Sequence, residues 1–108
     1  GQHPSPRVTT LSYPARLLLF TGDIWPDGRV SVSRLPDKDT RVAASEELMA
    51  RDLAEAVPFA QGLDLWRTDP ERGPLSLRLT EAGRAAAEAL DLCELAVAEE
   101  SWHLRRQD

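Results

Sequence analysis

One stretch, Leu63 to Leu90, constrains the fold more than any other, because it joins two alternating segments to an alanine-rich segment. Leucines occupy every second position of both alternating segments: Leu63 and Leu65 in the first, and Leu75, Leu77 and Leu79 in the second. Successive side chains of a strand point to opposite faces, so each segment can bury one leucine face. Residues 68–74 between them, TDPERGP, carry the prolines and the glycine that are typical of turns. The pattern predicts a β-hairpin with a shared leucine face.

The alanine-rich segment begins at a helix-capping position. Thr80 is the expected N-cap, and Glu81 lies in the first turn, where a carboxylate interacts favourably with the helix dipole. We predict one helix from Thr80 to about Arg106, which would be about 38 Å long and longer than the domain is wide. Its far end therefore needs a partner, and we expect a second copy of the chain. The apolar residues expected at this dimer contact are Leu90, Cys93, Val97, Trp102 and Leu104.

The first third of the chain gives weaker signals. Residues 1–10 are expected to be a loose lead-in, and residues 11–20 fit either a helix with Ser12 as its N-cap or a buried strand. A turn is predicted at Trp25–Gly28, from its proline and glycine. The alternating residues 28–35 then predict a short strand, which pairs either with residues 19–24 or with the sheet of the hairpin.

The middle of the chain predicts a second helix. Ser45 followed by two glutamates is a favourable helix start, and Pro58 removes a backbone donor, so the helix is expected over residues 45–57. Phe59 and Leu63 are then expected to enter the core. The fold class predicted from all these segments is α+β, with a small antiparallel sheet and a long C-terminal helix, in one domain over residues 11–108.

Composition places the chain among globular proteins. The hydrophobic content is 42% and the charged content 29%, and no apolar run approaches the length of a membrane span. A single cysteine, Cys93, fits a reducing compartment, so we expect a cytoplasmic protein with no membrane partner. The net charge of −5 argues against a nucleic-acid binder that ignores sequence.

The hairpin followed by LTEAGRAAAEAL, over residues 60–90, resembles the wing and following helix of winged-helix proteins, notably the MarR-like and PadR-like bacterial regulators. The resemblance implies a homodimeric transcriptional regulator that binds double-stranded DNA. In these proteins the helix before the hairpin enters the major groove, and the hairpin tip reaches phosphates or the minor groove beside it. The resemblance implies phosphate contacts by Arg67, Arg72 and Arg78, and contacts nearer the bases by Arg34, Lys38, Arg41 or Arg51.

The charge of the predicted helix 45–57 opens two alternatives. It carries one cation, Arg51, against four carboxylates, although phosphate contacts normally depend on cations. Either the basic residues 29–41 read the DNA instead, or the fold serves as a protein-interaction module whose acidic helices meet a basic partner.

The sequence offers little for catalysis or metal binding. His3 and His103 lie a hundred residues apart, and Cys93 has no histidine near it in the sequence, so no metal-ligand spacing is present. No glycine-rich loop suits a phosphate, and no nucleophile has a base and an orienting acid. We expect neither an enzyme nor a cofactor.

Overall fold

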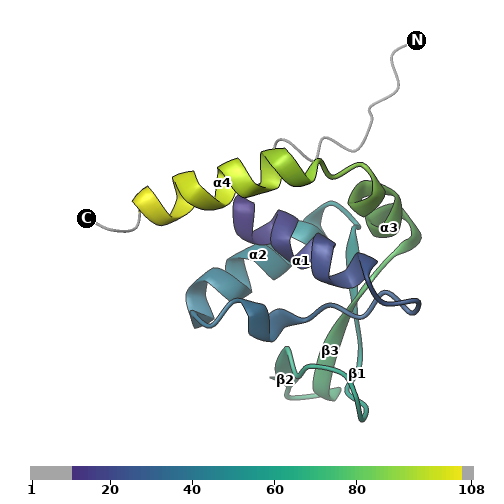
Figure 1. Ribbon diagram of the computed structural model, residues 1–108. Coiled ribbons are helices and arrows are strands. Elements are labelled where there is room, and N and C mark those ends of the chain that lie inside the picture. The colour runs from purple at the N-terminus through teal and green to yellow at the C-terminus, as the bar shows by residue number, and fades with distance from the viewer. Residues whose placement is uncertain (1–10, 106–108) are drawn as a thin grey trace.

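The computed structural model describes the backbone of residues 11–105 and the side chains of residues 11–103 (Figure 1). It is an α+β fold, as predicted, in which the helices gather at one end of an antiparallel three-stranded sheet. The strand order is β1-β3-β2. In chain order the elements are α1 (Tyr13–Asp23), the 3₁₀ helix η2 (Val32–Arg34), α2 (Lys38–Ala50), β1 (Ala54–Pro58), β2 (Arg67–Asp69), β3 (Gly73–Leu79), α3 (Glu81–Glu88) and α4 (Leu92–Arg105). No helix in this described part is long and apolar enough to cross a membrane. The predicted lead-in, residues 1–10, lies outside the described residues.

The ambiguous segment 11–20 is helical and forms most of α1. The Ser12 hydroxyl accepts a hydrogen bond from the Ala15 amide at 3.3 Å, so the predicted N-cap is confirmed. Leu18 and Leu19 have no exposed surface and lie at the centre of the core. The Glu47 carboxylate accepts from both the amide and the hydroxyl of Ser12 at 2.8 Å, which ties the start of α1 to α2.

The turn at Trp25–Gly28 is present, but the strand predicted after it is wrong. The chain makes only one isolated antiparallel bridge, between Arg29 and Arg78, and then curls into η2. The bridge lies on the edge of β3, as in the second of the two predicted pairings. Val30 and Val32 are both buried, so the alternating pattern correctly predicted which side chains face the core. Alternating burial over so few residues occurs both in strands and in tight turns, so the pattern alone cannot distinguish the two.

The second helix begins seven residues earlier than predicted and ends seven residues earlier. Asp37 is its N-cap, and the Asp37 carboxylate accepts from the Thr40 amide at 2.9 Å. Ser45 lies inside α2, where its buried hydroxyl donates to the Arg41 carbonyl at 2.7 Å. The helix therefore does not extend over residues 45–57, and residues 54–58 form β1 instead.

The leucine face of β3 is confirmed, whereas the first strand of the predicted hairpin is wrong. Leu75, Leu77 and Leu79 are all at most 3% exposed. β2 begins at Arg67 and pairs with β3 through Arg67↔Leu75 and Asp69↔Gly73. Residues 63 and 65 lie in the loop before it, where Leu65 is 52% exposed. Phe59 is also exposed, and Leu63 is only half-buried, contrary to prediction.

The long C-terminal helix is present as α4, but it does not start at Thr80. Thr80 caps the short α3, because its hydroxyl accepts from the Gly83 amide at 3.0 Å. The chain then breaks at residues 89–91, where the Asp91 carboxylate accepts from the Cys93 amide at 2.8 Å and starts α4. α4 lies across α1 (Figure 1), with Leu95 buried and the rings of Tyr13 and Trp102 6.4 Å apart. The break turns α4 back onto the domain.

Candidate nucleic-acid interface

A groove of about 540 Å³ lies between the first half of α2 and the start of β2. Its lining brings together three of the seven arginines and lysines that the sequence proposed for DNA contact, Lys38, Arg41 and Arg67. The other lining residues are Val42, Glu46, Trp66 and Thr68. Cations from two elements almost thirty residues apart therefore share one concave surface.

The side of the groove formed by α2 follows from the helix repeat. Residues 41, 42 and 46 follow residue 38 by three, four and eight positions, so all four lie on one side of the helix. Ala44 and Leu48, which are buried in the core, lie on the adjoining face of the helix. Lys38 lies in the first turn, and the exposed Val42 lies one turn later. The groove face of α2 thus presents two cations before its single carboxylate, Glu46.

The other side of the groove is built from the residues that enter β2. The Trp66 amide donates to the Leu75 carbonyl at 2.8 Å, which fixes the chain beside β3. The Arg67 guanidinium lies 5.4 Å from the centre of the Trp66 ring, a cation–π distance. This contact limits the positions that the Arg67 side chain can take. The indole N–H of Trp66 is buried and has no hydrogen-bond partner among the described residues.

One carboxylate stabilises the turn between β2 and β3. Asp69 accepts from the amides of Glu71 and Arg72 at 2.7 and 3.2 Å, and Gly73 adopts a φ of +79°. The two amides, Glu71 first, lower the pKa of Asp69, because they bind its charged form. The Arg72 side chain is exposed and forms no ion pair within residues 11–103. Its position at the tip is the one that the resemblance implied.

The remaining three cations of the sequence prediction lie elsewhere. Arg78 is bound to Glu55 across the β1–β3 pair at 2.8 Å, and Arg34 lines a separate hollow beside α4. Arg51 is the C-cap of α2, about 20 Å along the helix from Lys38. The structure therefore gathers Lys38, Arg41 and Arg67 and does not bring the other four into the same groove.

No family model, curated protein or solved structure matches this chain. Among residues 11–103, no three His, Cys, Asp or Glu side chains are grouped so that they could hold a metal ion.

Only some of the residues predicted to form the dimer contact are exposed on the outer face of α4. Cys93 and Val97 are exposed, Val97 by 64%, and Leu92, which the sequence reasoning left out, is 61% exposed beside them. Leu90 and Trp102 face the domain instead: Leu90 packs against the core, and Trp102 lies by Tyr13. Leu104 belongs to α4, but its side chain lies outside the described residues.

Proposed function

We propose that this protein is a DNA-binding transcriptional regulator that uses α2 and the β2–β3 turn as a winged helix uses its reading helix and wing. The observation that carries the proposal is the groove in which Lys38, Arg41 and Arg67 meet. The first half of α2 would enter the major groove of double-stranded DNA, and Arg67 and Arg72 would lie over the adjacent phosphates.

The order of the elements supports this assignment. α2 directly precedes β1, β3 is the central strand, and the short bridge at Arg29 lies on the edge of β3 opposite β1. The β2–β3 turn lies at the end of the sheet away from α3 and α4 (Figure 1). A helix followed by a projecting turn of an antiparallel sheet is the arrangement that places both elements against one duplex.

The bounds of α2 also exclude some of the carboxylates that would repel DNA from a helix over residues 45–57. In the structure, Asp52 and Glu55 lie after α2, and Glu55 is paired with Arg78. Glu47 is bound to Ser12 and does not line the groove. Glu46 is the one carboxylate in the groove lining, and Asp39 lies outside the lining in the first turn of α2. A carboxylate at Glu46 can accept a hydrogen bond from the amino group of cytosine. The groove is therefore suited to selective binding of modest strength.

A homodimer completes the proposal. The outer face of α4 exposes Leu92, Cys93 and Val97, and a second copy would cover these side chains. Two copies related by a two-fold axis would present two α2 helices to two half-sites of a palindromic sequence.

The test is fluorescence anisotropy of a labelled random duplex at low salt, followed by a salt titration. Each of Lys38→Ala, Arg41→Ala and Arg67→Ala should weaken retention of the duplex and reduce the salt slope by about 1, because one phosphate or groove contact is lost. Arg84→Ala is the matched control, since Arg84 belongs to α3 and does not line the groove. Absence of binding by the unaltered chain, or an equal loss in the control, would refute the proposal.

A second candidate function has its own supporting observation. Six carboxylates of the α3–α4 segment are exposed, Glu81, Glu88, Asp91, Glu94, Glu99 and Glu100, against the single described cation Arg84. This acidic surface favours a basic protein partner. Retention on an immobilised Lys/Arg-rich peptide, together with no binding of the duplex, would support that interaction module in place of the DNA-binding function.

A further inference from the structure

A second hollow, of about 350 Å³, lies between α4, α1 and the segment that leads from η2 into α2. Its apolar lining includes the rings of Tyr13 and Trp102 together with Leu17, Leu35 and Pro36. The volume and the aromatic lining are those of a site for a small molecule. The hollow shares no lining residue with the groove between α2 and β2.

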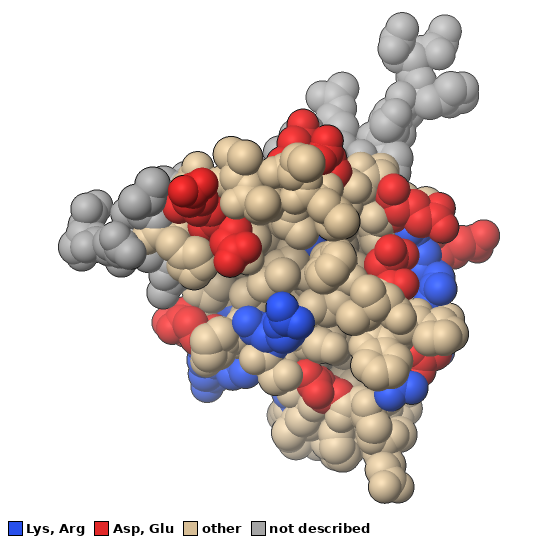
Figure 2. All heavy atoms as spheres, in the orientation of Figure 1, with Lys and Arg blue, Asp and Glu red and all other residues tan. Residues whose placement is uncertain are grey.

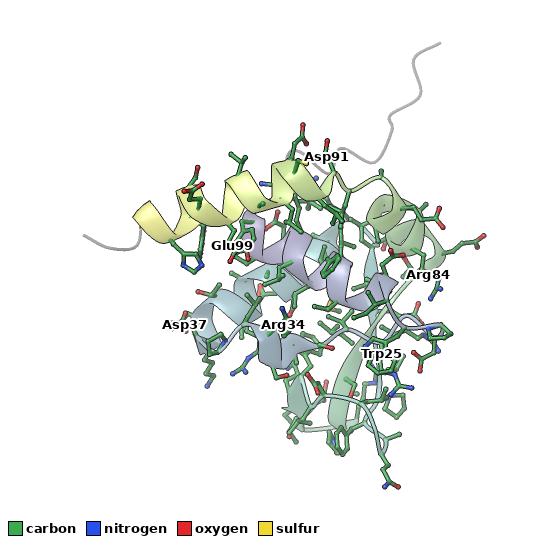
Figure 3. The ribbon with its side chains drawn as sticks, viewed as in Figure 1. Trp25, Arg34, Asp37, Arg84, Asp91 and Glu99 are labelled. Carbon is green, nitrogen blue, oxygen red and sulfur yellow. The ribbon has the colours of Figure 1, made fainter. Side chains whose placement is uncertain are left out.

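One cation, Arg34, and two carboxylates, Glu99 and Asp37, line this hollow. The Asp37 carboxylate accepts hydrogen bonds from the amide and hydroxyl of Thr40, whereas Arg34 and Glu99 do not neutralise each other. Arg34 and Glu99 come from different elements (Figure 3), and no ion pair joins them in the described part of the chain. Glu99 lies 3.8 Å from His103, which is too long for a hydrogen bond. Both groups act on Tyr13: burial raises the pKa of its phenol, Glu99 raises it further, and Arg34 opposes them. Each charge therefore lies near the same ring.

The surroundings make Arg34 distinctive. Figure 3 labels it near the middle of this face, where Figure 2 shows one isolated basic group surrounded by uncharged surface. A guanidinium binds a carboxylate through two parallel hydrogen bonds, and a carboxylate such as that of Glu99 binds an ammonium group. An anionic ligand would engage Arg34 alone, and a cationic ligand would engage Glu99 alone, whereas a zwitterion engages both groups.

We propose that this hollow binds a small zwitterion with a large apolar side chain, of the class of the aromatic α-amino acids. The ligand carboxylate would bind Arg34, its ammonium group would bind Glu99, and its side chain would lie against Tyr13 and Trp102. This site goes beyond the proposed DNA-binding function and does not depend on it.

Isothermal titration calorimetry with L-phenylalanine and L-tryptophan tests the ligand class. We expect saturable binding of at least one of the two. N-acetyl-L-phenylalanine lacks the ammonium group and L-phenylalaninamide lacks the carboxylate, so each should bind about tenfold more weakly or worse. No saturable binding of either amino acid, or equal binding of the blocked forms, would overturn the proposal.

Variants of the protein test the assigned groups. Arg34→Gln and Glu99→Gln should each weaken amino-acid binding about tenfold, because each leaves one ligand charge without its partner. Glu100→Gln is the matched control on the next residue of α4, which is exposed and does not line the hollow, and it should bind as the unaltered protein does. An Arg34→Gln protein with unchanged affinity would refute the assignment. Failure of these experiments leaves the duplex titration unaffected, so the two proposals fail separately.

Discussion

Gly83 gives a sharp test of how α3 packs on the rest of the domain. It lies in the LTEAGR motif, one turn after the Thr80 cap, and it is buried against the start of β1. A Cβ atom built on Gly83 would lie 1.8 Å from the carbonyl oxygen of Leu53, although real Cβ contacts are essentially never below 3.0 Å. The Leu53 carbonyl also accepts from the Thr80 amide at 3.1 Å, so it cannot turn aside without breaking that bond. A glycine is therefore required at this position for steric reasons.

The size of the effect follows from two opposing contributions. Alanine is preferred over glycine inside a helix by about 1 kcal/mol. Against this, α3 would have to retreat by roughly 1 Å from a close-packed contact, and overpacking of this kind costs about 1–3 kcal/mol, or more where backbone is displaced. Because the clash is with backbone atoms, the upper end of this range, about 3 kcal/mol, applies, and we expect Gly83→Ala to lower the free energy of unfolding by about 2 kcal/mol net. For a domain of this size that corresponds to a fall in Tm of about 8–16 °C.

Thermal and urea denaturation followed by circular dichroism measure the change. The matched control is Ala85→Gly, at an exposed position of the same helix, which should cost only the helix preference of about 1 kcal/mol. If α3 did not rest on Leu53, Gly83→Ala would behave as the reverse of this control and would raise Tm by several degrees. An unchanged or raised Tm would therefore refute the packing described for α3.

Two further predictions concern a buried hydroxyl and an ionised turn. The Ser76 hydroxyl is buried and has no hydrogen-bond partner among the described residues, so Ser76→Ala should leave the free energy of unfolding unchanged or raise it by up to about 1 kcal/mol. The control Ser45→Ala removes a hydroxyl that does form a hydrogen bond and should lower the free energy of unfolding by about 1 kcal/mol. Destabilisation by Ser76→Ala in urea denaturation would contradict this prediction. The folded-state pKa of Asp69 is lowered by the amides of Glu71 and Arg72, so its stabilising effect is present above the unfolded value of 3.8 and is lost as the pH falls through the folded value. A titration by ¹³C NMR should give an Asp69 pKa below 3.8, and titration at or above that value would show that these amide bonds do not hold the turn.

The parts of the fold that could be predicted are those determined by local chemistry. Leu75, Leu77 and Leu79 alternate along β3 because they share one buried face of the strand, and that periodicity is visible in the sequence. Ser12 and Thr80 were correctly identified as helix caps, since a hydroxyl before an amphipathic segment satisfies free amides wherever the helix later packs.

The errors arise where several residues offer the same local chemistry. Asp37 and Ser45 are both good N-caps, and the sequence alone did not show that Ser45 would be buried inside α2. Residues 54–58, AEAVP, favour a helix by composition, but pairing with β3 makes them a strand. Asp91 likewise starts a new helix within a segment whose alanine content predicts a continuous one. In each case tertiary contacts decided between local alternatives.

The candidate sites show the same limit more strongly. The rival segment 29–41 contains Lys38 and Arg41, but nothing in the sequence placed them opposite Arg67. The hollow at Arg34 and Glu99 depends on the break at residues 89–91, which turns α4 back across α1. A helix continuing from Thr80 would carry Trp102 away from Tyr13 and leave no such hollow. The sequence shows which residues are cations, but only the fold shows which of them lie together.

The bounds of α2 determine which charged side chains lie on the groove face of the helix. With the helix placed at residues 45–57, its one cation faces four carboxylates, and a polyanion would be repelled. With the helix at Lys38–Ala50, two cations precede Glu46 on the groove face, next to the positive end of the helix dipole. Glu47 is bound to Ser12 and Glu55 to Arg78, and neither lines the groove. Asp37 caps α2 and Asp39 lies in its first turn, so these two carboxylates are near Lys38 but are not part of the groove lining. The acidity of the whole chain thus coexists with a locally basic groove, and it is the local charge that a duplex held against α2 would meet.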